Sequence, residues 1–359
     1  MSSFRRSGLP EKIRSFRGED MPAVREILSL PSAETGITEE ADALRARFIG
    51  EGVLFRGIIN FSNFCDGACS YCGLNRPEGG LERYRMSPEE ILEAAGRVFR
   101  AGVRTIVLQS GQDGQDDCRS LAEVIREIKY RYDVAVTVSI GEKTEREYRV
   151  LRDAGADRYL LKIETSNRRI YEALHPGMSF DNRVRCLETL RALGFQTGSG
   201  IIVGLKGQTK ESLAEDLVFL GKLALDMVAV GPFVPHGETA LGLEPAGSRR
   251  EALSAISVMR ILSPLAHIPA TTALGAESLE PRMRALAGGA NVIMADFTPP
   301  RYARSYEIYP APEIRGSRPE DFIEQVKEKL PEMGRYADMS RGDSLLPGRR
   351  DENVYNTGK

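Results

Sequence analysis

Apolar, strand-like runs alternate with amphipathic, helix-like stretches from Leu54 to Ala295, and this alternation restricts the possible folds more than any other feature of the sequence. Parallel sheets produce this pattern because each strand is joined to the next by a crossover helix. We predict strands at 53–60, 104–109, 134–140, 157–164, 196–203, 226–231, 267–272 and 290–295, with helices near 87–101, 117–131, 144–154, 180–194, 209–224, 249–263 and 278–287. Eight such strands in about 240 residues predict an α/β fold of the (β/α)8 TIM-barrel type, for which roughly 250 residues are typical. An open, doubly wound sheet is the alternative.

The segments that flank this alternation divide the chain into three parts. Residues 1–50 are expected to form an N-terminal helical extension, and residues 51–334 the barrel. Residues 335–359 are polar and rich in Gly, Arg and Asp, so we expect a loosely ordered C-terminal tail.

Composition narrows the partners and the compartment. The net charge of −2 gives no indication of binding to nucleic acid or to acidic membranes. No apolar run approaches the ~20 residues that span a bilayer, and the charged first 20 residues lack the apolar core of a signal peptide. We therefore expect a cytoplasmic protein.

Several predicted strands carry polar residues in the phase that should face the barrel interior. These are Arg56 and Asn60 in the first strand, Thr137 and Ser139 in the third, and Arg158, Lys162 and Glu164 in the fourth. Barrel interiors are ordinarily filled by branched apolar side chains, and unpaired buried charge is costly. The pattern therefore predicts a wet, ligand-binding cavity. The alternative is that these charged side chains form ion pairs with one another and that no ligand binds.

Three cysteines, Cys65, Cys69 and Cys72, form a C-x3-C-x2-C motif directly after the first predicted strand. This position is the carboxyl end of the barrel strands, where barrel enzymes place their active sites. A cubane 4Fe-4S cluster normally takes four thiolates, so three thiolates leave one iron open to another ligand. The motif therefore predicts a three-cysteine 4Fe-4S cluster.

The other two cysteines and the histidines leave one competing interpretation. A structural zinc site requires a fourth ligand, which Cys118 or one of His175, His236 and His267 would have to supply in space. Cys118 and Cys186 are better explained as buried thiols, because free cysteine is among the most buried residue types.

The cysteine motif, with Tyr71 before its last cysteine, resembles the signature of the radical S-adenosylmethionine (SAM) superfamily. The surrounding sequence resembles the branch that contains biotin synthase, methylornithine synthase and the FeFe-hydrogenase maturase family HydE, and it is most similar to HydE. The matching stretches are Arg-Tyr-Arg-Met-Ser-Pro-Glu-Glu (83–90), Thr-Ile-Val-Leu-Gln-Ser-Gly (105–111), Ala-Asp-Arg-Tyr-Leu-Leu (156–161), Gly-Pro-Phe-Val-Pro-His (231–236), Ile-Pro-Ala-Thr-Thr-Ala (268–273) and Gly-Ala-Asn-Val-Ile-Met (289–294). The resemblance spans about Phe55 to Tyr309.

The resemblance implies a set of cofactor contacts across the top of the barrel. SAM would chelate the open iron, and its reductive cleavage would release a 5′-deoxyadenosyl radical. Tyr71 would flank the adenine, the turn of Gln109, Ser110 and Gly111 would receive the amino group, Glu164 would bind the ribose, Arg183 would pair with the carboxylate, and Met227 and Tyr306 would pack around the cofactor. A simple ion pair between Glu164 and Arg183 is the alternative for those two residues.

The resemblance also implies a substrate site deeper in the barrel. Its residues would be Arg56, Thr137, Arg158, Thr271, Thr272 and Met294. HydE-like enzymes act on an organometallic substrate, an iron complex that carries carbon monoxide, cyanide and cysteine, and the radical attacks the cysteine sulfur. Ferredoxin or flavodoxin would supply the electron, other hydrogenase maturases would be partners, and no general acid/base pair is expected.

Departures from the family pattern keep other functions open. Gln112 follows Gly111 where Glu is usual, Lys206 replaces a common Pro, and residues 236–240 read His-Gly-Glu-Thr-Ala instead of His-Pro-Asp-Thr-Pro. A second C-terminal cluster is not expected, because no cysteine follows Cys186. The alternatives are a related radical SAM enzyme that acts on an organic, amino-acid-type small molecule, and a non-catalytic iron–sulfur carrier.

Overall fold

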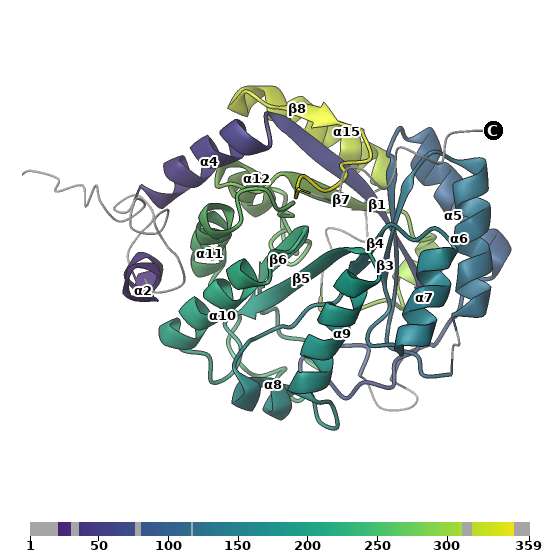
Figure 1. Cartoon of the computed structure of the whole chain (residues 1–359), viewed down its shortest axis with the longest axis horizontal. Coiled ribbons are helices and arrows are strands. Elements are labelled where there is room, and N and C mark those ends of the chain that lie inside the picture. The colour runs from purple at the N-terminus through teal and green to yellow at the C-terminus, as the bar shows by residue number, and fades with distance from the viewer. Residues whose placement is uncertain (1–20, 30–35, 76–79, 116–117, 311–317, 348–359) are drawn as a thin grey trace, which may run out of the picture.

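The computed structural model describes residues 21–29, 36–75, 80–115, 118–310 and 318–347, which form one parallel sheet surrounded by helices (Figure 1). The strands are β1 (Gly52–Ser62), β2 (Thr105–Ser110), β3 (Ala135–Ser139), β4 (Arg158–Leu160), β5 (Gln196–Val203), β6 (Met227–Pro232), β7 (Val292–Asp296) and β8 (Tyr336–Asp338). The helices are α2 (Met21–Ser29), α4 (Ile37–Phe48), α5 (Pro88–Arg100), α6 (Arg119–Arg131), α7 (Glu145–Asp153), α8 (Arg168–Leu174), α9 (Phe180–Ala192), α10 (Lys210–Lys222), α11 (Arg249–Leu262), α12 (Glu280–Ala287), α13 (Pro300–Ala303), α15 (Pro319–Lys329) and the 3-10 helix η1 (Leu330–Met333).

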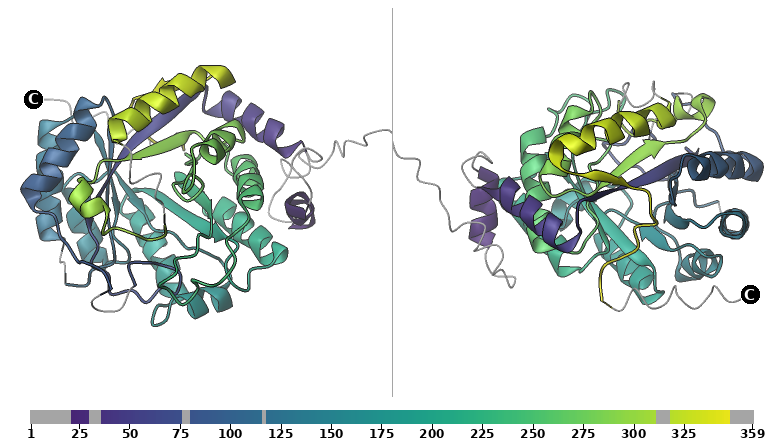
Figure 2. Two further views of the ribbon diagram at one scale, coloured as in Figure 1. Left: turned by 180° about the vertical axis from the view of Figure 1, so that it is seen from behind. Right: turned by 90° about the horizontal axis from the view of Figure 1, so that it is seen from above.

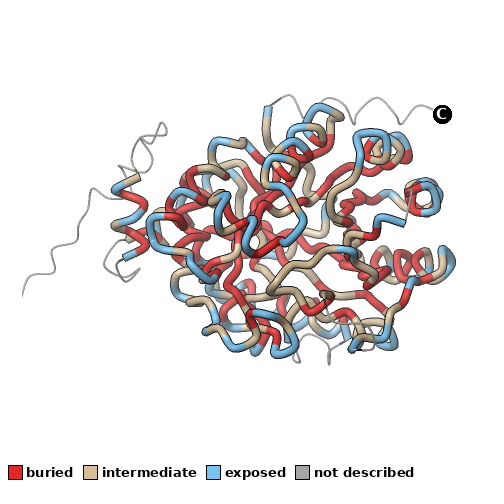
Figure 3. Tube along the Cα trace, turned by 90° about the horizontal axis from the view of Figure 1, so that it is seen from below, coloured by how far each residue is buried: buried red, intermediate tan, exposed pale blue. Residues whose placement is uncertain are grey.

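The sheet has the order β6-β5-β4-β3-β2-β1-β7, and every pair in it is parallel. This confirms the predicted alternation of strands and crossover helices. All residues of β1 and β6 are buried. The burial trace shows this inner layer enclosed by half-exposed helices (Figure 3), as expected for a sheet covered on its outer face.

The segment predicted as a strand at 267–272 is not a regular strand. His267 forms a parallel bridge with Met227, and Pro269 forms one with Val292. Pro269 has no N–H to donate, so the segment cannot continue a full ladder. It nevertheless lies between β6 and β7, because Val228 donates its N–H to the His267 carbonyl and Ala270 donates to the Val292 carbonyl.

Local signals fix several helix ends. Ser87 accepts a hydrogen bond from the Glu90 N–H while the Glu90 carboxylate accepts one from the Ser87 N–H, so α5 begins where the sequence predicts. α4 packs on α11, and α2 packs on α10 and α11, so both helices lie together on one side of the sheet (Figure 2). α8 is a short helix that the sequence analysis missed. No helix in the described residues is long and apolar enough to cross a membrane.

Residues 336–347 differ from the expected loosely ordered tail. β8 pairs in parallel with the first residues of β1, from Gly52 to Leu54. The chain then continues below the sheet, where Ser344 is buried. Polar contacts with the starts of several strands hold this stretch, and polarity alone gives no sign of them in the sequence. Residues 348–359 lie outside the described residues.

Candidate active site

The cysteine motif lies on the loop that follows β1, at the carboxyl ends of the strands. Three backbone hydrogen bonds tie this loop to other parts of the molecule: Asp66 N–H to the Gln112 carbonyl (2.7 Å), Ser70 N–H to that of Leu174 (2.9 Å) and Gly73 N–H to that of Ile308 (2.8 Å). Because the anchors follow β2, end α8 and follow α13, the loop is held from three sides. Cys65, Cys69 and Cys72 are half-buried there.

The donor set of this loop fits an iron–sulfur cluster. Burial, followed by the neighbouring thiols, raises the pKa of Cys69 and Cys72 to about 12, so positive charge is needed before all three thiols can ionise together. No group of three or more His, Cys, Asp or Glu within the described residues is arranged to hold a single metal ion. A cubane cluster does not require its three cysteines to point at a single metal ion, because each thiolate binds a different iron.

Glycine is required where the loop meets the turn after β2. A Cβ on Gly111 would lie 2.3 Å from the Phe64 carbonyl oxygen and 2.5 Å from the Cys65 Cβ. Gly111 therefore allows the turn to approach the cysteine loop closely. Ser110 donates its hydroxyl hydrogen to the Gly111 carbonyl at 2.7 Å, which further defines the turn.

Tyr71 is held by a histidine that the sequence analysis did not assign to the site. The Nδ1 of His175 lies 2.7 Å from the Tyr171 carbonyl, which can only accept a hydrogen bond, so Nδ1 carries the proton. Nε2 of His175 therefore accepts the Tyr71 hydroxyl at 2.9 Å. Burial lowers the pKa of His175 and favours this neutral form.

Glu164 occupies a strained position beyond the end of β4. Its φ is +64°, in the left-handed region that non-glycine residues rarely adopt. It is anchored by its N–H to the Gly200 carbonyl (2.9 Å) and by its own carbonyl, which accepts from Ile202 (3.0 Å). The regular strand β4 ends at Leu160, not at Glu164 as predicted, and Glu164 forms only an isolated parallel bridge with Ile201. Backbone strain of this kind clusters at functional sites.

The charged partners of Glu164 and Arg183 differ from the ion pair considered from the sequence. The Glu164 carboxylate lies 2.7 Å from Lys162 Nζ. Arg183 Nε donates to Glu142 at 2.6 Å, and its Nη1 donates to the Lys162 carbonyl. Burial opposes the charge of Arg183, but Tyr171 and Glu142 outweigh it, and the pKa of Arg183 is raised.

Gln112, where the family pattern commonly has Glu, has a defined role in this chain. Its Oε1 accepts the N–H of Glu142 at 2.8 Å. A Cβ on Gly141, whose φ is +78°, would lie 2.5 Å from the Gln112 Cβ. Gln112 therefore fixes the turn that carries Glu142, and Glu142 in turn holds Arg183.

Gln109 and Tyr306 lie beside the cysteines. The Gln109 amide nitrogen donates to the Tyr306 hydroxyl at 3.1 Å and to Asn60 Oδ1 at 3.2 Å. Burial is the main cause that raises the pKa of Tyr306, followed by contributions that include Cys72 and Cys65. The two residues thus share one polar contact on the cysteine side of the barrel.

A cavity of about 230 Å³ lies inside the barrel, and most of the predicted site residues line it. The predicted residues among its walls are Arg56, Tyr71, Gln109, Thr137, Glu164, Met227, Thr271, Thr272 and Met294. The walls also include Lys162, which the sequence analysis placed in the barrel interior, and Phe233 and Tyr309, which it did not assign to the site. Tyr309 shares a hydrogen bond with Thr272, another residue of the cavity wall. A cavity that several of the predicted polar side chains line is therefore present in the barrel.

Three buried polar atoms of residues that line this cavity have no hydrogen-bond partner: Nη2 of Arg56, Oγ1 of Thr137 and Oε2 of Glu164. Of these, Oε2 of Glu164 has the charged Lys162 beside it, which leaves the atoms of Arg56 and Thr137. Nη1 of Arg56 has only the thioether sulfur of Met227, at 3.0 Å. Burial and then Arg158 lower the pKa of Arg56, while Asp343 raises it. A buried guanidinium left this incompletely bonded is suited to an anionic ligand.

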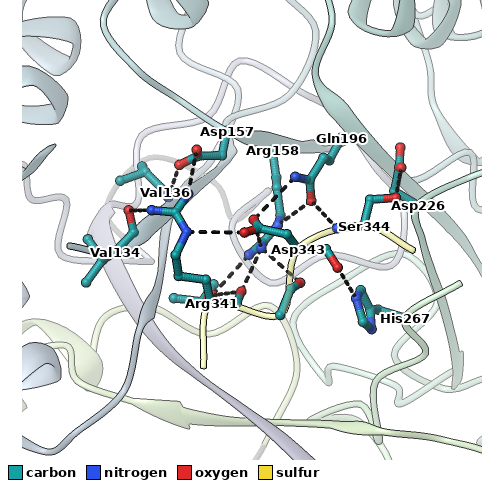
Figure 4. Close-up of polar contacts among 12 residues, drawn as sticks. Val134, Val136, Asp157, Arg158, Gln196, Asp226, His267, Arg341, Asp343 and Ser344 are labelled. Carbon is teal, nitrogen blue, oxygen red and sulfur yellow. Dashed lines mark hydrogen bonds and ion pairs between the residues drawn. The ribbon is translucent and has the colours of Figure 1, made fainter. Parts of the chain in front are cut away.

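Arg158 does not line the cavity, in contrast to its predicted contact with substrate. Its side chain is fully buried, and its guanidinium is occupied (Figure 4). Nε donates to Gln196 (2.8 Å), Nη1 donates to Thr105 (3.0 Å), and Nη2 donates to the Arg341 and Gly342 carbonyls and to Asp343. The two-residue alternation correctly predicts that Arg158 points into the barrel. Its side chain, however, lies in the layer below the cavity.

Cys118 and Cys186 are buried, as expected of structural thiols. Cys118 precedes α6, and Cys186 lies within α9, where its Sγ is 3.9 Å from Asn182 Nδ2.

Comparison with known proteins gives one consistent result. The profile of the Radical SAM superfamily matches residues 59–220. The [FeFe] hydrogenase maturase subunit HydE of Thermotoga maritima is 46% identical over 270 residues, 75% of this chain and 77% of that protein. The 3-methylornithine synthase of Methanosarcina barkeri is 30% identical over 281 residues, 77% of this chain and 79% of that protein. The crystal structure of methylornithine synthase (PylB) has a TM-score of 0.81 at 27% identity and covers 92% of this chain and 97% of that chain.

Proposed function

The chain belongs to the radical SAM superfamily, and on this premise we propose that it is a HydE-like maturase of the FeFe-hydrogenase active-site cluster. It is a radical SAM enzyme, and its identity with HydE, 46%, exceeds its identity with methylornithine synthase, 30%. The cysteine loop, the residues around it and the polar cavity below it are the parts that this function needs.

Cys65, Cys69 and Cys72 would hold one 4Fe-4S cluster, and SAM would occupy its open iron. When bound, the two cofactors supply a 5′-deoxyadenosyl radical by reductive cleavage of the sulfonium. The fit rests on the three-sided anchoring of the loop and on thiols that need positive charge in order to ionise.

The SAM contacts proposed for this chain surround the top of the cavity. Tyr71, oriented by His175, would flank the adenine, and Glu164 would accept the ribose hydroxyls. Arg183 would use Nη2 for the carboxylate, since its other two nitrogens are engaged. The turn of Gln109, Ser110 and Gly111 would receive the amino group, with Met227 and Tyr306 packing nearby.

The substrate would bind below SAM, and one observation carries this assignment. Arg56 and Thr137 present unpaired, buried polar atoms in the cavity, so the substrate site selects an anion. Thr271, Thr272 and Met294 would complete the site. An iron complex that carries carbon monoxide, cyanide and a cysteine ligand supplies such an anion, and the radical would attack its sulfur. Arg158 is left out, because its donors bind residues below the cavity.

The remaining proposals concern the whole chain. We propose that the sheet is a complete (β/α)8 barrel in which residues 267–269 replace a regular strand between β6 and β7. We propose residues 1–50 as the N-terminal extension and 51–334 as the barrel, with the first part of 335–359 packed against the barrel through β8 and residues 341–344. A cytoplasmic location, a ferredoxin or flavodoxin as electron donor and other hydrogenase maturases as partners follow from the proposed role, which requires reduced thiols.

The test begins with anaerobic reconstitution of the wild type and of Cys69→Ser with iron and sulfide. Both proteins are reduced with dithionite in the presence of SAM and assayed for 5′-deoxyadenosine. We expect the product from the wild type alone. No SAM cleavage by a cluster-loaded wild type would contradict the enzymatic function and favour an iron–sulfur carrier.

The substrate is tested in the same assay by adding either the cysteine-bound iron carbonyl cyanide complex or an organic amino acid such as lysine. We expect the iron complex to stimulate SAM cleavage and to be consumed. Stimulation by the amino acid alone would instead assign the chain to the methylornithine synthase type of reaction.

A further inference from the structure

Residues 341–344, which we call the floor segment, lie against the first residues of several strands, at the end of the barrel opposite the cysteine loop. Figure 4 shows the polar contacts of Arg341, Asp343 and Ser344. Their contacts reach residues at or next to the first positions of several strands. The Arg341 carbonyl accepts from Thr105 in β2 (2.8 Å), and the Arg341 and Gly342 carbonyls accept from Arg158 in β4. Beyond them, Ser344 N–H donates to Gln196 in β5 (3.1 Å), and the Ser344 hydroxyl donates to Asp226, next to β6.

The floor segment also reaches the irregular strand position between β6 and β7. His267 Nδ1 lies 3.0 Å from the Asn291 amide nitrogen and therefore accepts its hydrogen, so Nε2 carries the ring proton and donates to the Asp343 carbonyl at 3.1 Å. Gly342 has φ +55°, and a Cβ there would lie 2.5 Å from Leu54 in β1. The segment is therefore fitted closely against the barrel.

The charge at the centre of this arrangement comes from Asp343. Its carboxylate lies 3.0 Å from Arg158 Nη2, and Arg158 is fully buried. Arg158 is in register with Thr137, whose hydroxyl lines the cavity, so Asp343 and the cavity lie on two sides of one buried charge. Arg341 binds Asp343 too, together with Asp133 and Asp157.

Asp343 also acts on Arg56, the guanidinium inside the cavity. Arg158 lowers the pKa of Arg56 by repulsion, and Asp343 acts in the opposite direction. An anion in the cavity would feel both arginines as attractive and Asp343 as repulsive. At an effective dielectric constant of about 20, removing one unit charge close to the cavity would change the binding constant of an anion by roughly threefold to tenfold.

We propose that the floor segment closes the lower end of the cavity and that Asp343 limits the cavity's affinity for anions by neutralising part of the arginine charge. This inference rests on the anionic substrate class proposed above. Asp343 is a positioning residue: it touches Arg158 but does not line the cavity, so its charge offsets that of the arginines without contact with the ligand. Its effect would keep a charged product from being held too tightly.

The probe is thiocyanate, whose C≡N stretch in the infrared reports its surroundings. It is titrated into oxidised, cluster-loaded enzyme with SAM bound, so that the open iron is already occupied. We expect Asp343→Asn to bind thiocyanate about threefold to tenfold more tightly than wild type. A purely structural role for Asp343 would weaken binding, so the sign of the change separates the two roles.

Matched variants complete the experiment. Asp133→Asn removes the same charge from another partner of Arg341, at an exposed position, and should leave the affinity unchanged. Gln196→Glu keeps the hydrogen bonds that Gln196 Oε1 accepts but adds negative charge to the floor, so it should weaken binding. Arg56→Gln should abolish both binding and the shifted C≡N stretch, which locates the anion.

An affinity of Asp343→Asn equal to or below that of Asp133→Asn overturns the proposal. If Asp343→Asn does not hold a cluster, Gln196→Glu decides, and unchanged or tighter binding there overturns it. Thiocyanate binding that does not depend on Arg56 in the wild type also overturns it. SAM cleavage is assayed separately, so a wild type that binds thiocyanate as expected but makes no 5′-deoxyadenosine contradicts only the proposed function.

Discussion

At the scale of single residues, the site depends on partners that the sequence does not bring near each other. Tyr71 and His175 are 104 residues apart, yet they share a hydrogen bond of 2.9 Å. His175 also stacks on Tyr171, with ring centroids 4.2 Å apart. The orientation of Tyr71 is therefore set by a ring that is itself fixed.

The first prediction concerns this pair. His175→Phe removes the acceptor for the Tyr71 hydroxyl, and a lost hydrogen bond of about 1 kcal/mol corresponds to roughly fivefold weaker binding of SAM. The measurement is the SAM concentration at which the electron paramagnetic resonance signal of the reduced cluster changes by half. His175→Gln keeps an acceptor in its amide oxygen and should recover part of the affinity. Equal SAM affinity in all three proteins would show that Tyr71 needs no such partner.

The second prediction concerns the approach of two loops. Gly111→Ala places a Cβ 2.3 Å from the Phe64 carbonyl oxygen, so the cysteine loop must shift. We expect fewer iron atoms per chain after reconstitution and an altered cluster spectrum. Gly237→Ala is the control, because its Cβ would meet nothing within 4 Å. If Gly111→Ala takes up as much iron as the wild type, the cysteine loop can shift without losing its ability to hold the cluster.

At the scale of helices and strands, capping explains why α5 begins where the sequence predicts. Ser87→Ala removes the side-chain oxygen that accepts the Glu90 N–H, and the loss of such a cap costs about 1 kcal/mol. We expect the free energy of unfolding of the apoprotein in denaturant to fall by about this amount. Ser29→Ala, whose hydroxyl only bonds back to Arg25 in its own helix, should change it little. Equal losses in the two variants would argue against the cap.

The regular elements could be predicted because their signals are local. The positions of β5 and α10 follow from apolar runs and from the Thr209 cap, and both agree closely with the prediction. The cysteine loop was found in the same way, because its spacing is contiguous. Inward-facing side chains of β1 and β3 were also identified, since alternation requires only the neighbouring residues.

The irregular elements could not be predicted because their causes are distant in sequence. The left-handed conformation of Glu164, beyond the early end of β4, is held by its hydrogen bonds with Gly200 and Ile202 in β5. The layer of Arg158 depends on Asp343, which lies 185 residues further along the chain. A polar segment that gains its order from such contacts has no periodicity of its own.

At the scale of the whole molecule, buried charge makes stability depend on pH. Burial and the nearby Arg56 lower the pKa of His267 to about 3. In the unfolded chain the pKa of histidine is about 6.5, so the unfolded state binds more protons between these values. Folding stability is therefore complete above about pH 6.5 and is lost as the pH falls towards 3.

This gives the fourth prediction. The free energy of unfolding of the apoprotein should fall by up to about 1.4 kcal/mol for each pH unit in that window. His267→Gln removes the titrating group and should flatten the slope. Asn291→Ala disturbs the same buried network without removing that group, so it should lower stability at every pH but keep the slope. A slope in His267→Gln equal to that of wild type would assign the acid sensitivity to other groups.

The floor segment crosses the barrel last in the order of protein synthesis. At about 5–20 residues per second, Asp343 follows Arg158 out of the ribosome on the order of ten seconds or more later, because 185 residues separate them. During that interval the growing chain has its cysteine loop, while β5, β6, β7 and β8 are still being made and Arg158 has no carboxylate from Asp343. If the floor segment closes the cavity as proposed, the direction of translation makes this closure one of the last steps in building the barrel.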